Sequence, residues 1–275
     1  MKASTIFVAV FLAVSPIGTA GAQSAAPDVK QDRPLEDASE SSPSNTPDPS
    51  RFGERRDEAF GAYQRGYYLT ALELALPRAR KGDPAAQTLV AEIHARGLGV
   101  PRDAEEAAKW YAEAAEQGVP AAQLQYALML IDGRIVEQDR GKALALMRDA
   151  AQADEPLAQF NLAQMLVEDG EEQAAVTWYE RAAAAGLPDA QYAMAQIYET
   201  GFGGREQNLA EARKWLERAA SENYDTAQLD LGTWLIDGRG GEADPEKGFA
   251  WLKRAAESGN VAAQNRVAKL YRAGI

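Results

Sequence analysis

The order of apolar, small and polar side chains repeats along this chain about every 36 residues. Each period begins at an Ala-Gln pair, and successive glutamines are separated by 36, 36, 32, 37 and 36 residues. A large side chain follows three and seven positions after the glutamine, with a small residue at position four, so that all three share one helix face. The glutamines are Gln87, Gln123, Gln159, Gln191, Gln228 and Gln264.

A second helix is predicted in the other half of each period. Its markers are a large side chain, a small residue three positions before it, and two alanines four and five positions after it. Alternation of small and large side chains lets two helices approach and interdigitate. The large side chains are Trp110, Leu146, Trp178, Trp215 and Trp251.

Capping residues mark the ends of these second helices. Residues that favour a helix N-terminus stand seven positions before the large side chain, at Asp103, Asp139, Asn208 and Asp244. We expect Glu106 and Glu211 to complete capping boxes with Asp103 and Asn208. Residues that tolerate a left-handed backbone stand eight positions after the large side chain. They are Gly82, Gly118, Asp154, Gly186, Asn223 and Gly259.

Together these helices predict an all-α protein, a right-handed α-solenoid of tandem antiparallel two-helix repeats. Residues 52–84 are expected to form a degenerate cap, in which 56–64 and 68–80 fit two helices and Pro77 should kink the second. The predicted repeats cover residues 85–120, 121–156, 157–188, 189–225 and 226–261, followed by a partial sixth repeat at 262–275.

The first 51 residues differ from the rest. Lys2, an apolar run over 6–17 and small residues before Gln23 have the order of a secretory signal peptide, predicted over residues 1–22. Residues 23–51 are rich in Pro, Ser and Asp and poor in large apolar side chains, so we expect a disordered acidic linker. The protein should therefore be periplasmic or secreted, with no stable membrane insertion after signal cleavage.

Composition narrows the chemistry. The chain has no cysteine and one histidine, His94, which excludes disulfides and disfavours zinc sites and nucleophile–base pairs. No catalytic residue, metal or cofactor is therefore predicted. The net charge of −12 disfavours nucleic acid as a partner. His94 stands where other repeats have Leu or Tyr, so a half-buried packing role is expected.

Three other features have a structural interpretation beside a functional one. The Trp positions could form an aromatic platform, but a fixed place in the repeat favours packing between helices. The glycine-rich turns at 97–100 and 201–204 lack the spacing of a phosphate-binding loop. The acidic side chains follow caps and exposed helix positions, so a catalytic carboxylate pair is not expected.

These marks resemble the Sel-one-like repeat family, a branch of the tetratricopeptide (TPR) superfamily. The segment Ala85–Gly118, AAQTLVAEIHARGLGVPRDAEEAAKWYAEAAEQG, is similar to a consensus copy, and the resemblance covers residues 85–275 and more loosely 52–84. It implies an adaptor, scaffold or regulator that engages other proteins. The unit at 157–188 departs from the pattern, because residues 168–172 replace the glycine loop, and it resembles an ordinary tetratricopeptide unit.

The first helices line the concave side of related solenoids, which makes their exposed positions candidate partner contacts. The side chains one and five positions after the glutamine could form an exposed, partly apolar stripe. The alternative is that they pack against the neighbouring repeat. We expect Phe160 and Tyr192 to be the main contacts. The candidate residues are Leu124, Leu128, Phe160, Gln164, Tyr192, Gln196 and Leu229.

The predicted function is that of an exported, non-catalytic repeat protein that binds other proteins or peptides in the cell envelope. Two alternatives stay open: an envelope enzyme acting on β-lactams or cell-wall material, and a glycan- or peptidoglycan-binding structural protein. One exported branch of the family has a disulfide in each repeat and a link to β-lactam binding or hydrolysis. The absence of cysteine here argues against carrying that activity over.

Overall fold

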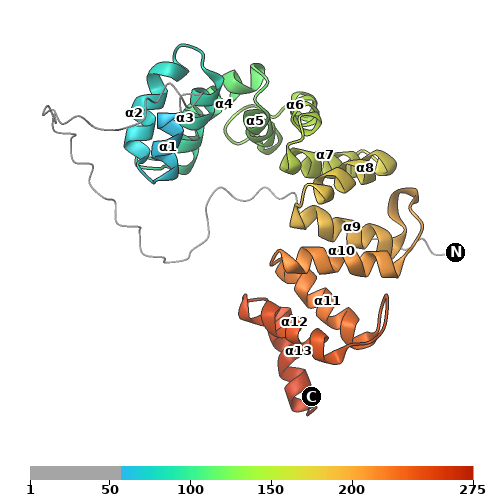
Figure 1. Ribbon diagram of the computed structural model, residues 1–275. Helices are drawn as coiled ribbons and strands as arrows, with labels where there is room; N and C mark the ends of the chain where they lie inside the picture. The colour runs from blue at the N-terminus through green and yellow to red at the C-terminus, as the bar shows by residue number, and fades with distance from the viewer. Residues whose placement is uncertain (1–56, 275) are drawn as a thin grey trace, which may run out of the picture. The chain divides into compact units, whose positions relative to one another are not determined.

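A computed structural model of the protein describes residues 57–274, in which every regular element is a helix (Figure 1). The signal peptide and linker predicted over residues 1–51 lie outside the described residues. The described part of the chain forms two compact units, residues 57–139 and residues 140–274.

The N-terminal unit contains the degenerate first hairpin and the helices that follow it. The two helices expected near residues 56–64 and 68–80 are present as α1 and α2. The bounds in this unit are α1 Glu58–Gln64, α2 Tyr68–Ala79, α3 Pro84–Arg96, α4 Ala104–Glu116 and α5 Pro120–Asp132.

The C-terminal unit contains eight α-helices and one short 3-10 helix, η2. The bounds are α6 Arg140–Gln152, α7 Pro156–Glu168, α8 Glu172–Ala184, α9 Pro188–Thr200, η2 Phe202–Gly204, α10 Leu209–Ser221, α11 Asp225–Asp237, α12 Pro245–Glu257 and α13 Val261–Arg272.

Within each unit, every α-helix packs against the helix before it and the helix after it in the sequence. Odd-numbered helices from α3 onward carry the Ala-Gln pair, and even-numbered helices from α4 onward carry the large side chain of the second-helix pattern. The fold class predicted from the period, an α-solenoid of tandem two-helix repeats, is confirmed.

The recurring glutamine satisfies the end of the preceding helix. The side-chain amide of Gln228 donates a 3.1 Å hydrogen bond to the carbonyl oxygen of Ala220, near the end of α10. The last carbonyls of a helix lack the usual intrahelical partner, and this amide adds a bond to the one that the backbone N–H of Asn223 donates at 3.2 Å. The same bond, to the carbonyl eight residues earlier, is made by Gln87, Gln123, Gln159 and Gln264. The alanine before the glutamine is at most 1% exposed in all six copies.

The left-handed positions predicted at the ends of the second helices are confirmed. All six have a positive φ angle, including Asp154 at 61° and Asn223 at 65°. Short polar side chains that bond locally make this conformation less costly for Asp and Asn than for other non-glycine residues. Each position reverses the chain at the same point of its repeat, which brings the next first helix back against the second.

The predicted capping boxes are only half formed. Asp103 caps α4 by accepting a 2.9 Å hydrogen bond from the backbone N–H of Glu106. The N–H of Asp103 donates to the carbonyl oxygen of His94 at 3.0 Å, so the returning bond from the glutamate is not needed. Glu106 instead accepts a 2.9 Å bond from the indole N–H of Trp110. Asn208 likewise caps α10, while its own N–H donates to a carbonyl of α9.

The Trp side chains of the second helices are half-buried, at the edge of the core and not at its centre. A guanidinium three residues later lies over the rings of Trp178, Trp215 and Trp251, at 4.2 to 5.2 Å from the ring centre. The residue after the Trp position is the deeply buried one. These residues, at most 7% exposed, are Tyr111, Met147, Tyr179, Leu216 and Leu252.

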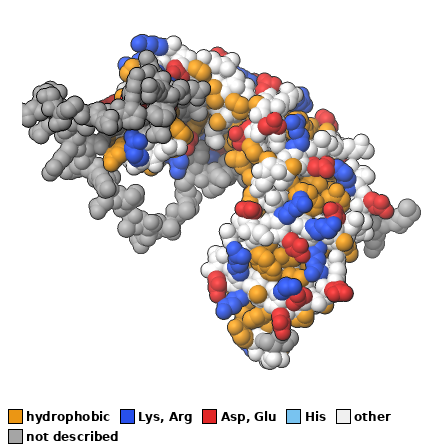
Figure 2. All heavy atoms as spheres, in the orientation of Figure 1, with side chains coloured by type: hydrophobic (Ala, Val, Ile, Leu, Met, Phe, Trp, Pro, Cys, Tyr) orange, Lys and Arg blue, Asp and Glu red, His pale blue; other side chains and the backbone are white. Residues whose placement is uncertain are grey.

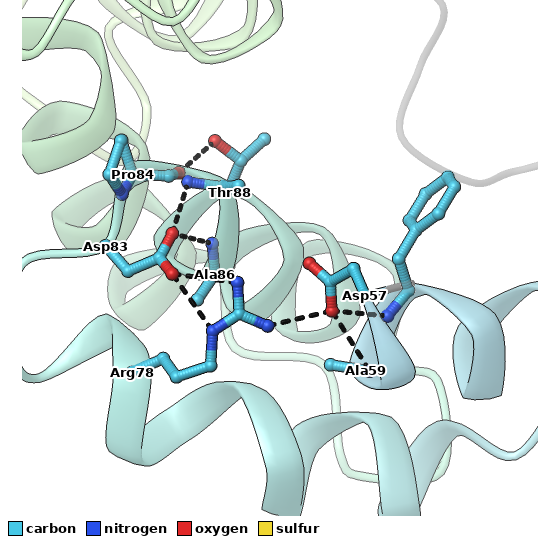
Figure 3. Close-up of polar contacts among 9 residues, drawn as sticks. Asp57, Ala59, Arg78, Asp83, Pro84, Ala86 and Thr88 are labelled. Carbon is cyan, nitrogen blue, oxygen red and sulfur yellow. Dashed lines mark hydrogen bonds and ion pairs between the residues drawn. The ribbon is translucent and has the colours of Figure 1, made fainter. Parts of the chain in front are cut away.

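One arginine joins two helix N-termini in the N-terminal unit (Figure 3). Arg78, in the last turn of α2, lies 2.8 Å from a carboxylate oxygen of Asp57 and 2.8 Å from one of Asp83. Asp57 caps α1 and Asp83 caps α3, each by accepting two backbone N–H bonds. The helix that carries Arg78 runs through Pro77 and ends two residues later, at Ala79.

Acidic and basic side chains are interspersed over the face shown in Figure 2, with hydrophobic side chains between them. Within residues 57–274, no helix combines the length and apolar character that crossing a bilayer requires.

Candidate partner-binding surface

The seven residues predicted to contact a partner differ in their burial. Leu124, Phe160 and Gln164 are buried, with 3%, 8% and 8% of their surface exposed. The apolar stripe expected along the first helices is therefore interrupted. The residues that are half-buried, and so keep part of their surface accessible, are Leu128, Tyr192, Gln196 and Leu229.

Leu124 lies in α5, and the other two buried residues lie in α7, the first helix of the short repeat. Residues 158–166 of this helix are all buried. Phe160 meets the ring of Tyr179 in α8 edge-on, with 5.5 Å between ring centres. This packing leaves little of Phe160 for a partner, and the role of the stripe in partner binding stays a prediction.

Tyr192 belongs to a cluster of aromatic and charged side chains on α9, α11 and the turn after α11. Its phenol donates a 2.7 Å hydrogen bond to the carboxylate of Asp230, in the first helix of the next repeat. Glu199, in the last turn of α9, pairs with Arg239 at 2.7 Å. The Arg239 guanidinium lies 4.3 Å from the ring centre of Trp234. We call these five residues the α9–α11 patch.

Burial dominates the electrostatics of the patch. Removal from water raises the pKa of Asp230 above its usual range, although the hydrogen bond from Tyr192 acts in the opposite direction. The negative charge of Glu199 adds to the rise, and the positive charge of Arg239 opposes it. Burial, followed by the nearby charge of Asp230, also raises the pKa of Tyr192. The phenol therefore stays protonated and keeps donating at physiological pH.

A related arrangement occurs in the N-terminal unit. Glu92 of α3 accepts a 2.7 Å hydrogen bond from the phenol of Tyr111 in α4 and pairs with Arg96 at 3.1 Å. Arg96 also donates to the phenol of Tyr63 in α1 at 3.2 Å. Burial raises the pKa of Tyr111, so that phenol also remains a donor. In the N-terminal unit one carboxylate thus contacts both a phenol and a guanidinium, whereas in the α9–α11 patch the phenol bonds Asp230 and the guanidinium pairs with Glu199.

Asp230, Glu199 and Arg239 were not singled out by the repeat pattern. Asp230 stands two positions after the glutamine, where the other complete repeats have Leu, Gln, Asn or Ala. A single charge at an otherwise uncharged position is the signal that could have indicated it. The pairing of Asp230 with Tyr192 joins two repeats, and no periodic pattern reports such a contact.

The patch can donate and accept hydrogen bonds, pair with charges, and stack against aromatic or guanidinium groups. Within the described range, no three or more His, Cys, Asp or Glu side chains are grouped so that they could hold a metal ion. His94 is half-buried, and its Nδ1 atom is enclosed without a hydrogen-bond partner, which agrees with the packing role expected for it.

Comparison with known protein families identifies the repeat. The Sel1 repeat model matches more than half of the chain, in five consecutive copies at residues 84–119, 120–155, 156–187, 188–224 and 225–260. Among solved structures, the chain is similar to a Sel1 repeat protein from Oxalobacter formigenes, with a TM-score of 0.67 and 33% identity. The match covers 73% of this chain and 59% of that one.

Two curated relatives have names that denote regulators. An exopolysaccharide production negative regulator of Rhizobium leguminosarum bv. viciae is 27% identical over 198 residues, which are 72% of this chain and 66% of that protein. Chitin synthase regulatory factor 3 of Schizosaccharomyces pombe is 33% identical over 98 residues, which are 35% of this chain and 10% of that protein. The chain thus spans less than two thirds of the length of either relative.

Proposed function

This chain belongs to the Sel1-repeat family, and from that premise we propose that it is a non-catalytic adaptor or regulator that binds another protein outside the cytoplasm. Stacked helix pairs present an extended surface suited to protein contacts. The regulatory part of the proposal is supported by the names of the two curated relatives, each of which this chain matches over part of its length.

The α9–α11 patch is the observation that carries the proposal. It places the half-buried phenol of Tyr192, two carboxylates and a guanidinium on neighbouring repeats, and the guanidinium of Arg239 lies over the buried ring of Trp234. Tyr and Arg are among the residues that most often dominate the binding energy of protein interfaces. The Arg239 side chain is 43% exposed, so a partner can reach it. Gln196 and Leu229, which are half-buried on the same two helices, are proposed as flanking contacts.

Location outside the cytoplasm is supported by the sequence of residues 1–22, which has the order of a signal peptide. Expression of the whole chain followed by mass spectrometry of the extracytoplasmic fraction tests it. We expect a product that begins at Gln23. Ala20→Arg combined with Ala22→Arg should block cleavage at this site and leave the leader attached. A wild-type product that keeps Met1 and stays in the cytoplasm would refute export.

Site-specific photo-crosslinking in cells tests partner binding. A photo-reactive amino acid replaces Gln196 or Leu229 on the first helices, and Lys253 serves as a matched control on the exposed face of a second helix. We expect one discrete adduct at the first pair of positions and none at the control. Arg239→Glu should reduce the yield of that adduct, because it reverses the charge that the patch offers a partner.

Assays on the purified protein test the two alternative functions. Purified residues 23–275 are mixed with a chromogenic β-lactam and, separately, with insoluble peptidoglycan. We expect neither turnover nor saturable retention. Turnover that Arg239→Glu leaves unchanged would indicate an enzyme, and saturable retention without a protein adduct would indicate a glycan-binding protein. Either result overturns the proposal.

A further inference from the structure

An arginine of one second helix contacts the turn that ends the repeat before it. Arg181, three positions after Trp178, donates a 3.0 Å hydrogen bond to a carboxylate oxygen of Asp154, the left-handed residue after α6. The same oxygen accepts a 3.3 Å bond from the side-chain amide of Gln159. One carboxylate oxygen is thus held by a guanidinium and by the recurring glutamine.

The contact recurs between α12 and the turn after α10. Arg254, again three positions after the Trp of its helix, donates a 2.7 Å hydrogen bond to the side-chain oxygen of Asn223, the left-handed residue of that turn. Both turns therefore supply an oxygen from their own side chain, a carboxylate in one case and an amide in the other. In both cases an exposed arginine of the following second helix donates to that oxygen.

The turn after α8 has no such oxygen. Its left-handed residue is Gly186, at a φ of 91°, and among the described residues no heavy atom beyond its two chain neighbours lies within 4 Å of where its Cβ would be. Arg218 of α10 occupies the position of Arg181 and Arg254. Its guanidinium lies 4.2 Å from the ring centre of Trp215. That guanidinium forms no ion pair or hydrogen bond within the described part of the chain.

The glutamine of the same repeat is also without a partner. Gln191 is 7% exposed, and its Oε1 atom is enclosed with no hydrogen-bond donor beside it. Of the six recurring glutamines, it is the one whose amide makes no bond to a carbonyl of the preceding helix. Leaving a buried amide unbonded costs free energy. The two groups that hold the Asp154 oxygen one repeat earlier, an amide and a guanidinium, therefore both lack an acceptor among the described residues.

We propose that Gly186, Gln191 and Arg218 form a binding site for an acidic side chain of a partner protein. We call these three residues the Gly186 site. The partner's carboxylate takes the place that the Asp154 side chain has one repeat earlier, and it accepts hydrogen bonds from the Gln191 amide and the Arg218 guanidinium. The proposal deepens the adaptor function above, on which it rests, by adding a contact that involves a second helix.

Charge and exposure define what the Gly186 site contributes. Glu222, four positions after Arg218, pairs with no cation of the described residues, so the guanidinium is not neutralised by its own helix. Both bonds to Asp154 go to one oxygen, which suits a carboxylate better than a phosphate with three oxygens to satisfy. Because Arg218 is exposed, the ion pair adds little affinity. The site therefore selects partners by the position of an acidic residue.

End-blocked tripeptides test this chemistry. Isotope-labelled protein comprising residues 23–275 is titrated with Gly-Asp-Gly, Gly-Asn-Gly and Gly-phosphoserine-Gly. The NMR signals of the Gln191 side-chain amide and the Trp215 indole report binding at the site. We expect saturable shifts of both signals, and about threefold tighter binding of the aspartate peptide than of the asparagine peptide. Raising the salt concentration should reduce this difference.

Substitutions locate the binding to the Gly186 site. Gly186→Asp supplies the carboxylate from the chain itself and should abolish peptide binding. Gly186→Ala places a side chain at the same left-handed position without a carboxylate and should retain binding. Arg218→Gln should remove the preference for aspartate over asparagine. Arg254→Gln, at the equivalent arginine that already bonds Asn223, is the matched control and should leave the preference unchanged. Circular dichroism verifies that each variant is folded.

Thermal unfolding gives a second readout that requires no peptide. The internal carboxylate should make Gly186→Asp unfold about 2 °C higher than Gly186→Ala. In the Arg218→Gln background this difference should shrink, because the carboxylate then has no guanidinium to accept from. An unchanged difference in that background would mean that Arg218 does not bind a carboxylate at this position, and would overturn the proposal.

Three results of the titrations would also overturn it: equal affinity for the aspartate and asparagine peptides, no saturable shift at Gln191, or equal effects of Arg218→Gln and Arg254→Gln. Tighter binding of the phosphoserine peptide would assign the site to a phosphate instead of a carboxylate, which overturns the proposal as well. These measurements use the purified protein and do not depend on adducts at Gln196 or Leu229. Failure of this inference is therefore distinguishable from failure of the adaptor function.

Discussion

Gly232 of α11 and Gly248 of α12 lie so close that neither can carry a methyl group in place. A Cβ on Gly232 would lie 2.8 Å from the carbonyl oxygen of Gly248, and one on Gly248 would lie 2.6 Å from the carbonyl oxygen of Gly232. The other four complete repeats have alanine at both positions. The hairpin of α11 and α12 therefore depends on glycine where the others do not.

Gly232→Ala should lower the free energy of unfolding by about 1–3 kcal/mol, because it forces two packed helices apart. Gly61→Ala is the matched control. A Cβ on Gly61, in α1, would meet only the flexible side chain of Arg65, and the gain in helix propensity should stabilise the protein by about 0.5–1 kcal/mol. Urea titration followed by circular dichroism measures both. Opposite signs are expected, and equal effects would contradict the close approach.

The contribution of the recurring glutamine to the free energy of unfolding should be larger where its side chain is more buried. Gln228→Ala removes a buried hydrogen bond to the carbonyl of Ala220, which still accepts from the backbone N–H of Asn223, and should cost about 1 kcal/mol. Gln264 makes the same bond to Ala256 but is exposed, so water can replace it. Gln264→Ala should therefore cost about 0.5 kcal/mol or less. Thermal unfolding of the two variants measures the difference, and a larger loss for Gln264→Ala would be inconsistent with it.

Asp230 should make stability fall as pH rises. Its pKa is raised in the folded protein, mainly by burial, so the folded state holds a proton that the unfolded state has released. Asp230→Asn removes this ionisation and should stabilise the protein at pH 7. The advantage should shrink as pH falls through the raised pKa and vanish near the unfolded pKa of about 4. Unfolding free energies measured between about pH 4 and pH 8 provide the check.

Tyr192→Phe tests the other half of this pair. The phenylalanine removes the hydrogen bond that favours the ionised carboxylate, and should cost about 1–3 kcal/mol at pH 7. In the Asp230→Asn background the same change should cost less, because the acceptor is then neutral. A double-mutant cycle by urea unfolding measures the coupling. Equal costs in the two backgrounds would mean that the hydrogen bond does not stabilise the ionised carboxylate of Asp230 more than a neutral acceptor.

The stabilisation from the caps joined by Arg78 should change with pH in the direction opposite to that expected for Asp230. Burial acts to raise the pKa of Asp83, but hydrogen bonds from the N–H of Ala86 and from Arg78 outweigh it and lower the pKa. The stabilisation is therefore present above the unfolded pKa of about 4 and is lost as pH falls below it. Asp83→Ala should cost about 1 kcal/mol at pH 7. Asp83→Asn keeps a capping oxygen and should cost less, but it removes the ionisation and with it the dependence of stability on pH at this site. Unfolding free energies measured at about pH 7 and pH 3 test both expectations.

Much of the fold could be predicted because each repeat uses the same local chemistry. Asp154 and Asn223 were expected at left-handed positions from their residue type and place, and they adopt them. The buried aromatic position was harder to predict. Trp110 is the more uniform marker between repeats, whereas the neighbouring Tyr111 is the deeper side chain. A core position requires volume more than identity, so Tyr, Met and Leu replace one another there.

The candidate surface was less predictable than the fold. Phe160 occupies a position that is half-buried on α9 and α11 but buried on α7, and on α5, where the residue is Leu124. The packing around each first helix therefore decides the exposure of this position, which the sequence period does not report. Asp230 and Tyr192 come from different repeats and different repeat positions, so their contact depends on how neighbouring repeats stack. Local periodicity contains no information about such single pairings.

The glutamine bond to the preceding helix has a consequence for how such arrays grow and shorten. It ties the second helix of one repeat to the first helix of the next, as Gln228 does with Ala220. The natural module for duplication or deletion is therefore offset by half a period from the conventional repeat boundary. An engineer who splices two arrays should cut within the turn inside a hairpin, because a cut between hairpins would separate each glutamine from the carbonyl it evolved to meet.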